Sequence, residues 1–162
     1  MMTFEQLYET FFKDVYRFSL WLSRNRSEAE DVASETFVRA WVRRDKLRTE
    51  TLKAYLLAIA RSVFCELRRK GSNREALPEG LPDAAPDPHR RASARSELER
   101  VEHILAQLPE PDRVALLLRA EHALPYAEVA RVLEISEGAA RVKVHRARRR
   151  LLETRLTNHG GT

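Results

Sequence analysis

Apolar residues recur every three or four positions along most of this chain, which places them on one face of an α-helix. In the first seventy residues the pattern forms three segments, at about 3–22, 27–41 and 51–69, separated by short polar stretches. No stretch shows the regular alternation of apolar and polar residues that indicates a strand. Three helices joined by short loops predict a helical bundle over residues 1–70.

Two of these helices carry capping signals at their starts. A capping box pairs a Ser or Thr at the helix N-cap with a Glu or Gln three residues later. Thr3 with Gln6, and Ser27 with Glu30, have this spacing. We therefore predict that Thr3 caps the first helix and that Ser27 opens the second.

The character of the sequence changes after the first bundle. Residues 71–89 hold four of the seven prolines and few large apolar residues, a composition typical of flexible linkers. Helical spacing returns by Ser96, and it continues through four segments that lie at about 96–108, 112–121, 126–133 and 136–156. The chain is thus predicted to be all-α, with a flexible proline-rich linker over 71–95, a four-helix domain over 96–156 and a disordered tail over 157–162.

Two of the C-terminal segments have the layout of a helix-turn-helix. The first is short, and Ile135 occupies the turn that separates it from the second. Ser136 is a good N-cap, because its hydroxyl can accept a hydrogen bond from an amide of the next turn. The apolar positions that the second helix would bury follow at intervals of four, three and four, namely Ala140, Val144, Ala147 and Leu151. Such a helix fits the major groove of DNA.

The charge distribution favours a polyanionic partner. The net charge is +5 and the pI is about 9.7. Seven basic residues fall between Arg141 and Arg155, where Glu153 is the only acid. Basic residues on a helix that enters DNA neutralise phosphates. The alternative for the run 148–150 is a solvated basic helix end, which the helix dipole also favours.

Composition argues against a membrane protein and against a disulfide scaffold. No apolar run approaches the roughly 18–20 residues that span a bilayer, and the first residues do not resemble a signal peptide. The single cysteine, Cys65, lies in a helical apolar pattern and fits a small core residue better than a nucleophile. We therefore expect a cytoplasmic chain without membrane insertion.

The sequence offers no site for catalysis. The five histidines are scattered, without metal-ligand spacing, and there is no phosphate-binding glycine loop or serine nucleophile motif. The pairs 102–103 and 121–122 place Glu beside His on a helix, where adjacent side chains diverge. We expect no enzyme activity, no metal and no cofactor.

Three sequence runs resemble one family. Residues 124–148 read LPYAEVARVLEISEGAARVKVHRAR, and this run resembles the −35-reading domain of extracytoplasmic-function (ECF) sigma factors. Residues 28–41 read EAEDVASETFVRAW and residues 52–63 read LKAYLLAIARSV. These two resemble the polymerase-binding helix and the −10-reading helix of the same family, in the same order. The resemblance implies a sigma factor of the sigma-70 family, which binds core RNA polymerase and carries it to promoters.

The resemblance implies a −35 site in the C-terminal domain. The residues that it places on duplex DNA are Arg119, Tyr126, Ser136, Gly138, Ala139, Arg141, Val142, His145, Arg146 and Arg149. Arg141 and Arg146 are the expected bidentate contacts to guanine or phosphate. Gly138 would let the start of the helix approach the DNA backbone closely.

The resemblance also implies a polymerase-binding surface in the N-terminal domain. The second predicted helix would bind the clamp helices of the polymerase's largest subunit, with Asp31 and Glu35 facing basic groups and Arg39 reaching acidic ones. Phe37 and Trp41 would mainly hold this helix to its bundle. The alternative for the two aromatic residues is a purely structural role.

The third predicted helix and the loop before it would capture the opened −10 strand. The residues concerned are Arg48, Thr49, Glu50, Lys53, Tyr55, Arg61, Ser62, Arg68 and Arg69. Capture of a single strand needs positive charge along the backbone and a pocket for an extruded base. The alternative for Tyr55 is a core aromatic residue.

The partners implied by the resemblance are core RNA polymerase, including the flap of its second-largest subunit, and promoter DNA. The linker would thread through the polymerase near its active site. An anti-sigma factor that covers both binding faces is a further implied partner. Phosphorylation of Ser34 or Thr36 is an alternative form of control.

Several residues depart from the family pattern. Glu134 stands where the turn usually has glycine, so we expect this turn not to use a left-handed conformation. Ala139 and Val142 replace hydroxyl residues, which reduces hydrogen-bond readout and allows contact with thymine methyl groups. Ser62 replaces a frequent asparagine and Tyr55 a frequent tryptophan. These departures bear on the promoter sequence that is recognised.

A plain helix-turn-helix regulator is the main alternative. It would share the C-terminal domain and bind duplex DNA without polymerase. It does not account for the acidic and aromatic helix at 28–41 or for the helix at 51–69. Promoter opening, which only a sigma factor supports, discriminates between the two.

Overall fold

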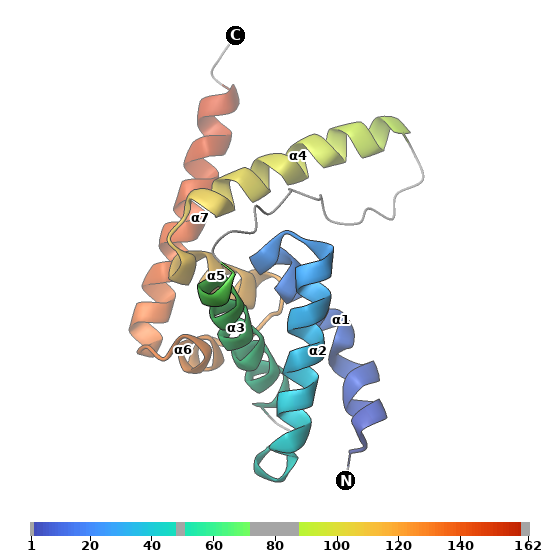
Figure 1. Cartoon of the computed structure of the whole chain (residues 1–162). Helices are drawn as coiled ribbons and strands as arrows, with labels where there is room; N and C mark the ends of the chain where they lie inside the picture. The colour runs from blue at the N-terminus through green and yellow to red at the C-terminus, as the bar shows by residue number, and fades with distance from the viewer. Residues whose placement is uncertain (1, 48–50, 72–87, 160–162) are drawn as a thin grey trace. The chain divides into compact units, whose positions relative to one another are not determined.

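The computed structural model describes residues 2–47, 51–71 and 88–159. For residues 88–95 and 155–159 it describes the backbone alone. Within these ranges every regular element is a helix (Figure 1). The chain divides into two compact units, residues 1–81 and 82–162. The all-α architecture with two domains is therefore confirmed. Of the predicted linker, residues 72–87 lie outside the described residues.

The first unit is a three-helix bundle. It consists of α1 (Phe4–Ser23), α2 (Arg26–Val42) and α3 (Leu52–Lys70), with a short 3-10 helix, η1 (Arg44–Lys46), after α2. Each long helix packs on the other two. The side chains between them are almost fully buried, and they include Leu7, Val15, Phe18, Leu22, Val32, Phe37, Leu56, Leu57 and Val63. The apolar stripe of each helix thus supplies the core, as its spacing predicted.

The start of α1 is the capping box that the sequence predicted. Thr3 Oγ1 accepts a hydrogen bond from the amide of Gln6 at 3.1 Å, and Gln6 Oε1 accepts one from the amide of Thr3 at 2.9 Å. Two amides that have no partner within the helix are satisfied in this way. The first helix therefore begins where local sequence chemistry places it.

The start of α2 differs from the prediction. Its N-cap is Asn25, whose Oδ1 accepts a hydrogen bond from the amide of Glu28 at 3.0 Å, so the assignment of the cap to Ser27 was wrong. Asn caps a helix about as well as Ser does. Arg24 adopts a left-handed conformation with φ 56° at the end of α1, which reverses the chain and brings Asn25 into the capping position.

The second unit contains four helices. They are α4 (Pro88–Gln107), α5 (Glu110–Ala120), α6 (Tyr126–Leu133) and α7 (Glu137–His159). Helix α7 packs on the other three, and α5 also packs on α6. The buried apolar side chains of this unit include Ile104, Leu105, Leu108, Val114, Leu117, Leu118, Val129, Leu133, Ala140, Val144 and Ala147.

Two helix boundaries in this unit lie three or more residues outside the predicted ones. Helix α4 begins at Pro88, eight residues before the predicted start at Ser96, and α7 continues to His159, into the segment predicted to be a disordered tail. Proline is favoured in the first turn of a helix, because its missing amide hydrogen has no partner there. Apolar spacing missed the early turns of α4, because residues 88–95 contain no large apolar side chain.

Candidate nucleic-acid and polymerase interfaces

Helices α6 and α7 form the predicted helix-turn-helix. Val129, Ala130 and Leu133 of α6 face the core, with exposures of 0–6%. On α7 the residues at the predicted inward positions are buried, and these are Ala140, Val144 and Ala147. Leu151 is half-buried. The inward stripe of α7 thereby fixes which of its residues face outward.

The N-terminus of α7 is held by Ser136. Its Oγ accepts a hydrogen bond from the amide of Ala139 at 3.1 Å, which confirms the predicted cap. Gly138 lies in the next turn, and a Cβ added there would meet nothing within 4 Å. The fold of this unit therefore does not require glycine at this position, and the open space suits close approach by a partner.

The turn between α6 and α7 contradicts the expectation for Glu134. This residue adopts a left-handed conformation, with φ 56° and ψ 44°. Its amide lies 3.3 Å from the carbonyl of Arg131, and the amide of Ile135 bonds the carbonyl of Ala130 at 3.0 Å. These bonds close the end of α6 in the way that a left-handed cap does. The cost of such a conformation for a residue with a Cβ is roughly 1–2 kcal/mol.

The outward face of α7 carries most of the residues predicted to meet −35 DNA. Its exposed members are Arg141, Val142, His145, Arg146 and Arg149. A shallow groove on α7 is lined by Val142, His145, Arg146, Arg148, Arg149 and Leu152. Lys143 is different, because its Nζ lies 3.7 Å from Oδ1 of Asp112, whose side chain is only 6% exposed. Lys143 thus ties α7 to α5.

Three predicted residues from different helices meet around the ring of Tyr126. The guanidinium carbon of Arg119 lies 4.6 Å from the ring centroid, and that of Arg141 lies 4.5 Å from it. Arg119 Nη1 also donates to the carbonyl of Leu124 at 3.1 Å. Arg141 Nη2 donates to Glu137 Oε1 at 3.1 Å. The structure therefore brings α5, the start of α6 and the start of α7 together in one basic cluster.

In the first unit, the acidic residues of α2 are exposed, whereas its aromatic residues pack against the bundle. Asp31 and Glu35 are exposed. Phe37 is only 1% exposed. Trp41 is half-buried and packs edge-on against Phe4, with ring centroids 5.6 Å apart. The two aromatic residues therefore hold α2 to the bundle, while the two acids face outward.

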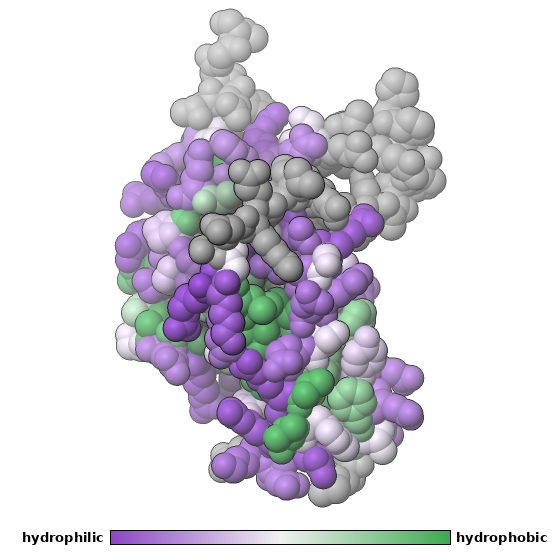
Figure 2. All heavy atoms as spheres, in the orientation of Figure 1, coloured by the Kyte–Doolittle hydropathy of each residue, from purple (hydrophilic) through white to green (hydrophobic). Residues whose placement is uncertain are grey.

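Two exposed valines extend the outward face of α2. Val38 and Val42 are 53% and 72% exposed, and they follow Asp31 and Glu35 at intervals of three and four. Figure 2 shows apolar side chains at the surface of the first unit over the lower part of α2. Sequence reasoning did not single them out, although their spacing separates them from the buried stripe. Exposed apolar groups beside charges are typical of protein-binding surfaces.

The two hydroxyl residues considered for phosphorylation differ in accessibility. Ser34 is exposed on α2. Thr36 is fully buried, and its hydroxyl donates to the carbonyl of Val32 at 2.7 Å. A kinase could not reach the Thr36 hydroxyl in the folded unit, so the structure excludes Thr36 as a site on the surface.

Arg39 bonds acids of its own unit. Its Nη1 and Nη2 donate to Glu66 Oε1 and Oε2 of α3 at 3.1 and 2.6 Å, and its Nε donates to Glu35 Oε1 at 2.9 Å. The hydrogen bond from Arg39 lowers the pKa of Glu66, and the bonds from Glu66 and Glu35 raise the pKa of Arg39. The prediction had Arg39 reaching a partner's acids, whereas here it bridges α2 and α3.

Two of the α3 residues predicted to bind the −10 strand, Lys53 and Arg68, lie near acids of their own unit. Arg68 is engaged within the unit: its Nε lies 3.3 Å from Glu28 Oε1, and its Nη2 donates to the carbonyl of Ser23 at 3.2 Å. Lys53 Nζ lies 3.9 Å from an Asp14 oxygen. Exposed or half-buried positions are held by Tyr55, Arg61, Ser62 and Arg69. Arg48, Thr49 and Glu50 lie outside the described residues.

Comparison with known proteins matches both units. Residues 7–74 match the family described as Sigma-70 region 2, and residues 98–151 match Sigma-70, region 4. The ECF RNA polymerase sigma factor SigC of Mycobacterium tuberculosis is 36% identical over 143 residues, covering 86% of this chain and 76% of that protein. The chain belongs to the ECF sigma factors of the sigma-70 family.

Other similar proteins agree with this assignment. Bacillus subtilis SigM is 29% identical over 155 residues, covering 93% of each chain, and Escherichia coli FecI, a ferric citrate uptake sigma factor, is 30% identical over 165 residues, covering 96% of this chain and 92% of FecI. Among solved structures, Bartonella quintana RpoE in complex with the anti-sigma factor NepR has a TM-score of 0.77 at 24% identity, covering 93% and 94% of the two chains. That likeness shows the shared fold.

The family assigns a function to the two units. As an ECF sigma factor, the protein directs RNA polymerase to promoters. The region 2 match contains most of α1 and all of α2 and α3, and the region 4 match contains α5 and α6 with the second half of α4 and the first part of α7. We refer to the first unit as region 2 and to the second as region 4.

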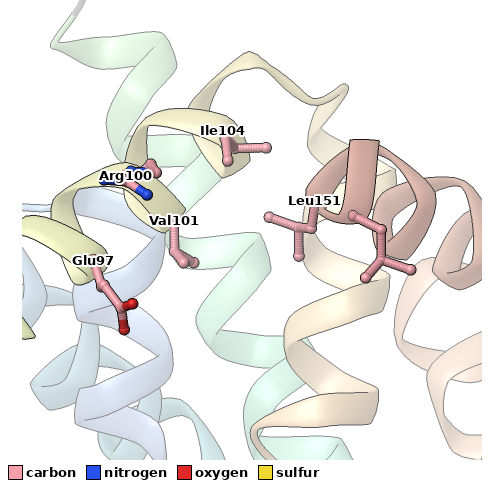
Figure 3. Close-up of a pocket in the computed structure, with 6 residues that line it drawn as sticks. Glu97, Arg100, Val101, Ile104 and Leu151 are labelled. Atoms are coloured by element: carbon pink, nitrogen blue, oxygen red, sulfur yellow. The ribbon is translucent and has the colours of Figure 1, made fainter. Parts of the chain in front are cut away.

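Region 4 has a second concave surface, between α4 and α7. The groove is lined by Glu97, Arg100, Val101, Ile104, Leu151 and Leu152. Ile104 and Leu151 point toward one another across it (Figure 3). Val101 and Leu152 are 37% and 59% exposed. An apolar floor with an acid and a base at its edge fits an amphipathic helix.

Neither a metal-binding cluster nor a membrane-spanning helix is found in the described part of the chain. Among those residues, no group of three or more His, Cys, Asp or Glu side chains could hold a metal ion. No helix there is both long enough and apolar enough to cross a membrane.

Proposed function

We propose that region 4 of this sigma factor reads the −35 element through the outward face of α7. The observation that carries the proposal is the Arg119–Tyr126–Arg141 cluster at the start of the helix. In helix-turn-helix proteins the first turns of the second helix meet base edges in the major groove. Arginine is the commonest reader of guanine there, through paired donors to O6 and N7. Arg146, further along the exposed face, would bind guanine or a phosphate, and Arg149 would bind a phosphate.

We propose that region 2 binds the clamp helices of the polymerase's largest subunit through the stripe Asp31, Glu35, Val38 and Val42. Two exposed carboxylates followed by two exposed valines offer charge pairing and apolar burial on one helix face. Arg39 supports this stripe by fixing Glu35 against α3. Phe37 and Trp41 act indirectly, because their rings pack on α1.

We propose that α3 captures the melted −10 strand. The exposed positions that support this are Ser62 and Arg69, with Arg61 and Tyr55 half-buried beside them. Arginine can neutralise the strand's backbone, and an aromatic ring can stack on an extruded base. Arg68 and Lys53 pair with acids inside the unit, so we assign them a smaller share of this binding.

The groove between α4 and α7 is the proposed site for the flap of the polymerase's second-largest subunit. On α7, its apolar side chains Leu151 and Leu152 lie about 15 Å along the helix from Arg141, at 1.5 Å of rise per residue. One helix can therefore bind DNA near its start and polymerase further along. We further propose that the protein acts in the cytoplasm, without catalysis of its own, and that an anti-sigma factor regulates it, as NepR binds RpoE in the similar structure.

In vitro transcription tests the proposed function. The full chain would be added to bacterial core polymerase with a library of promoter fragments. We expect specific transcripts whose templates share −35 and −10 elements. Glu35→Lys should reduce transcription from every such promoter, whereas a control on an exposed face of region 4, Arg131→Ala, should not. Specific binding to duplex DNA without any transcript would support a plain helix-turn-helix regulator.

A further inference from the structure

The side chain expected to read the −35 element is already fixed in the protein alone. Arg141 stacks on Tyr126 with its guanidinium carbon 4.5 Å from the ring centroid. Its Nη2 donates to Glu137 Oε1 at 3.1 Å, one helical turn earlier. An exposed arginine without such contacts samples many rotamers and must be ordered when it binds. Two independent contacts therefore restrict Arg141 before DNA arrives.

The geometry leaves Arg141 able to bind a base. Stacking uses the flat face of a guanidinium group, so its N–H donors remain available in the plane of the group. Glu137 accepts from one terminal nitrogen, Nη2. The remaining donors suit paired acceptors such as O6 and N7 of guanine. Half-exposure of both partners, 55% for the Arg141 side chain and 51% for that of Glu137, keeps the pair open to solvent and DNA.

Tyr126 itself is fixed by a second cation. Arg119 of α5 lies 4.6 Å from the same ring centroid, and it is tethered by its bond to the carbonyl of Leu124. Tyr126 is the first residue of α6 and is half-buried. The ring thus links a residue anchored on α5 to the reading residue on α7.

We propose that Tyr126 and Glu137 are positioning residues for Arg141 and help to set promoter specificity. Tyr126 acts through the face of its ring and not through a bond from its hydroxyl to DNA. Glu137, whose carboxylate alone would repel phosphates, acts as the in-plane anchor for the Arg141 guanidinium. The inference rests on the proposed function of region 4 in reading the −35 element.

The test uses the full chain with core polymerase and a set of promoters that carry every single substitution in the −35 element. Arg141→Ala first identifies the base pair whose discrimination depends on Arg141. Tyr126→Phe keeps the ring and loses the hydroxyl, whereas Tyr126→Leu loses the ring. We expect Tyr126→Phe to keep discrimination at that base pair within about twofold, and Tyr126→Leu to lower it about fivefold or more.

Combining variants separates positioning from an independent contact. If Tyr126 acts through Arg141, Tyr126→Leu should cause no further loss of discrimination in the Arg141→Ala background. Glu137→Gln, an exposed change that tests the anchor without touching the core, should lower discrimination at the same base pair with unchanged thermal unfolding. It keeps the proposal testable if Tyr126→Leu fails to fold. Arg131→Ala is the matched control for loss of a nearby cation and should leave discrimination unchanged.

Other outcomes would overturn the inference. If Tyr126→Phe lowered discrimination at that base pair as much as Tyr126→Leu does, the hydroxyl would be making a direct contact. If Glu137→Gln left discrimination unchanged, the anchor role would be wrong. Failure of the unaltered chain to transcribe any promoter would instead contradict the proposed function, so the two failures are distinguishable.

Discussion

Region 2 and region 4 of this sigma factor use arginine in different ways. In region 2, Arg39 and Arg68 each bond groups on a neighbouring helix, so their charges help to hold the bundle together. On α7 the side chains of Arg146, Arg148 and Arg149 are exposed. The number of basic residues alone therefore does not locate a nucleic-acid surface, because an arginine can instead hold the helices of its own unit together.

The difference has a consequence for salt dependence. An arginine that neutralises a DNA phosphate releases counterions, so affinity falls steeply as salt rises. A half-exposed ion pair within a domain contributes only about 0–1 kcal/mol and changes the free energy of unfolding little. We therefore expect salt to weaken DNA binding by region 4 strongly while leaving the stability of region 2 nearly unchanged.

The largest expected effect is a loss of stability caused by a substitution on the inner, buried face of α2. Phe37 is 1% exposed, and its ring lies 5.0 Å from that of Tyr8. Phe37→Ala should lower the free energy of unfolding of region 2 by about 3–5 kcal/mol. Denaturant unfolding followed by tryptophan fluorescence measures this, because both tryptophans, Trp21 and Trp41, lie in region 2.

Glu35→Lys is the control on the outward face of α2. It should change the free energy of unfolding by no more than about 1 kcal/mol, while impairing binding to core polymerase. A loss of stability as large as that of Phe37→Ala would mean that the outward face belongs to the core of the bundle.

A smaller effect is expected at the arginines of α7. Arg141→Ala or Arg146→Ala should weaken −35-dependent initiation by about 1–3 kcal/mol where a base contact is lost. Initiation rates on matched promoters with intact and substituted −35 elements measure this loss. Unchanged promoter choice in both variants would remove them from the base-reading surface.

In the turn between α6 and α7, a substitution should raise the stability of region 4 and not lower it. Glu134→Gly removes the Cβ from a residue with φ 56°, and we expect a gain of roughly 1 kcal/mol in the free energy of unfolding of region 4. Glu134→Ala keeps the strain and should give no such gain. Thermal unfolding by circular dichroism should shift upward for glycine, with the tryptophan transition of region 2 unmoved. An upward shift for alanine too would argue against strain as the cause.

The smallest effect concerns the pH dependence of region 2. The hydrogen bond from Arg39 lowers the pKa of Glu66 from its ordinary value of 4.5. A lowered pKa in the folded state means that ionised Glu66 stabilises region 2 above pH 4.5, and that this stabilisation is lost as the pH falls through the folded-state pKa. Glu66→Gln should therefore lower the melting temperature at pH 7. The difference in melting temperature between the variant and the unaltered chain should shrink as the pH is lowered below 4.5. A difference that is constant with pH would contradict this role.

Most of the fold could be predicted because each helix carries its own apolar stripe. The exceptions are local. The early turns of α4 lack large apolar residues. Asn25 caps α2 in place of Ser27, because the helix begins at Arg26, directly after Asn25, so that Ser27 lies inside the first turn. Glu134 was expected to avoid a left-handed conformation, but the hydrogen bonds at the end of α6 and the packing of α7 impose it.

Sequence alone predicted more of the candidate site in region 4 than in region 2. The outward residues of α7 follow from its inward stripe, and the pair Glu137–Arg141 has the spacing of one helical turn. The bridge from Arg39 to Glu66 joins residues 27 positions apart, so it depends on how α2 packs on α3. Sequence alone placed Arg39 opposite a partner's acids, and it did not predict the bonds that Arg39 makes to Glu66 and Glu35.

Under the proposed function, the outward face of α2 binds polymerase whichever promoter is used, whereas the outward face of α7 reads the −35 element. Abortive initiation by holoenzyme, on promoters with an intact or a substituted −35 element, compares Glu35→Lys with Arg141→Ala directly. We predict that Glu35→Lys lowers initiation on both promoters by the same factor and that added core polymerase restores it. Arg141→Ala should lower initiation on the intact promoter alone, so that the preference for the −35 element shrinks. Equal loss of preference in both variants would contradict the separate roles proposed for the outward faces of α2 and α7.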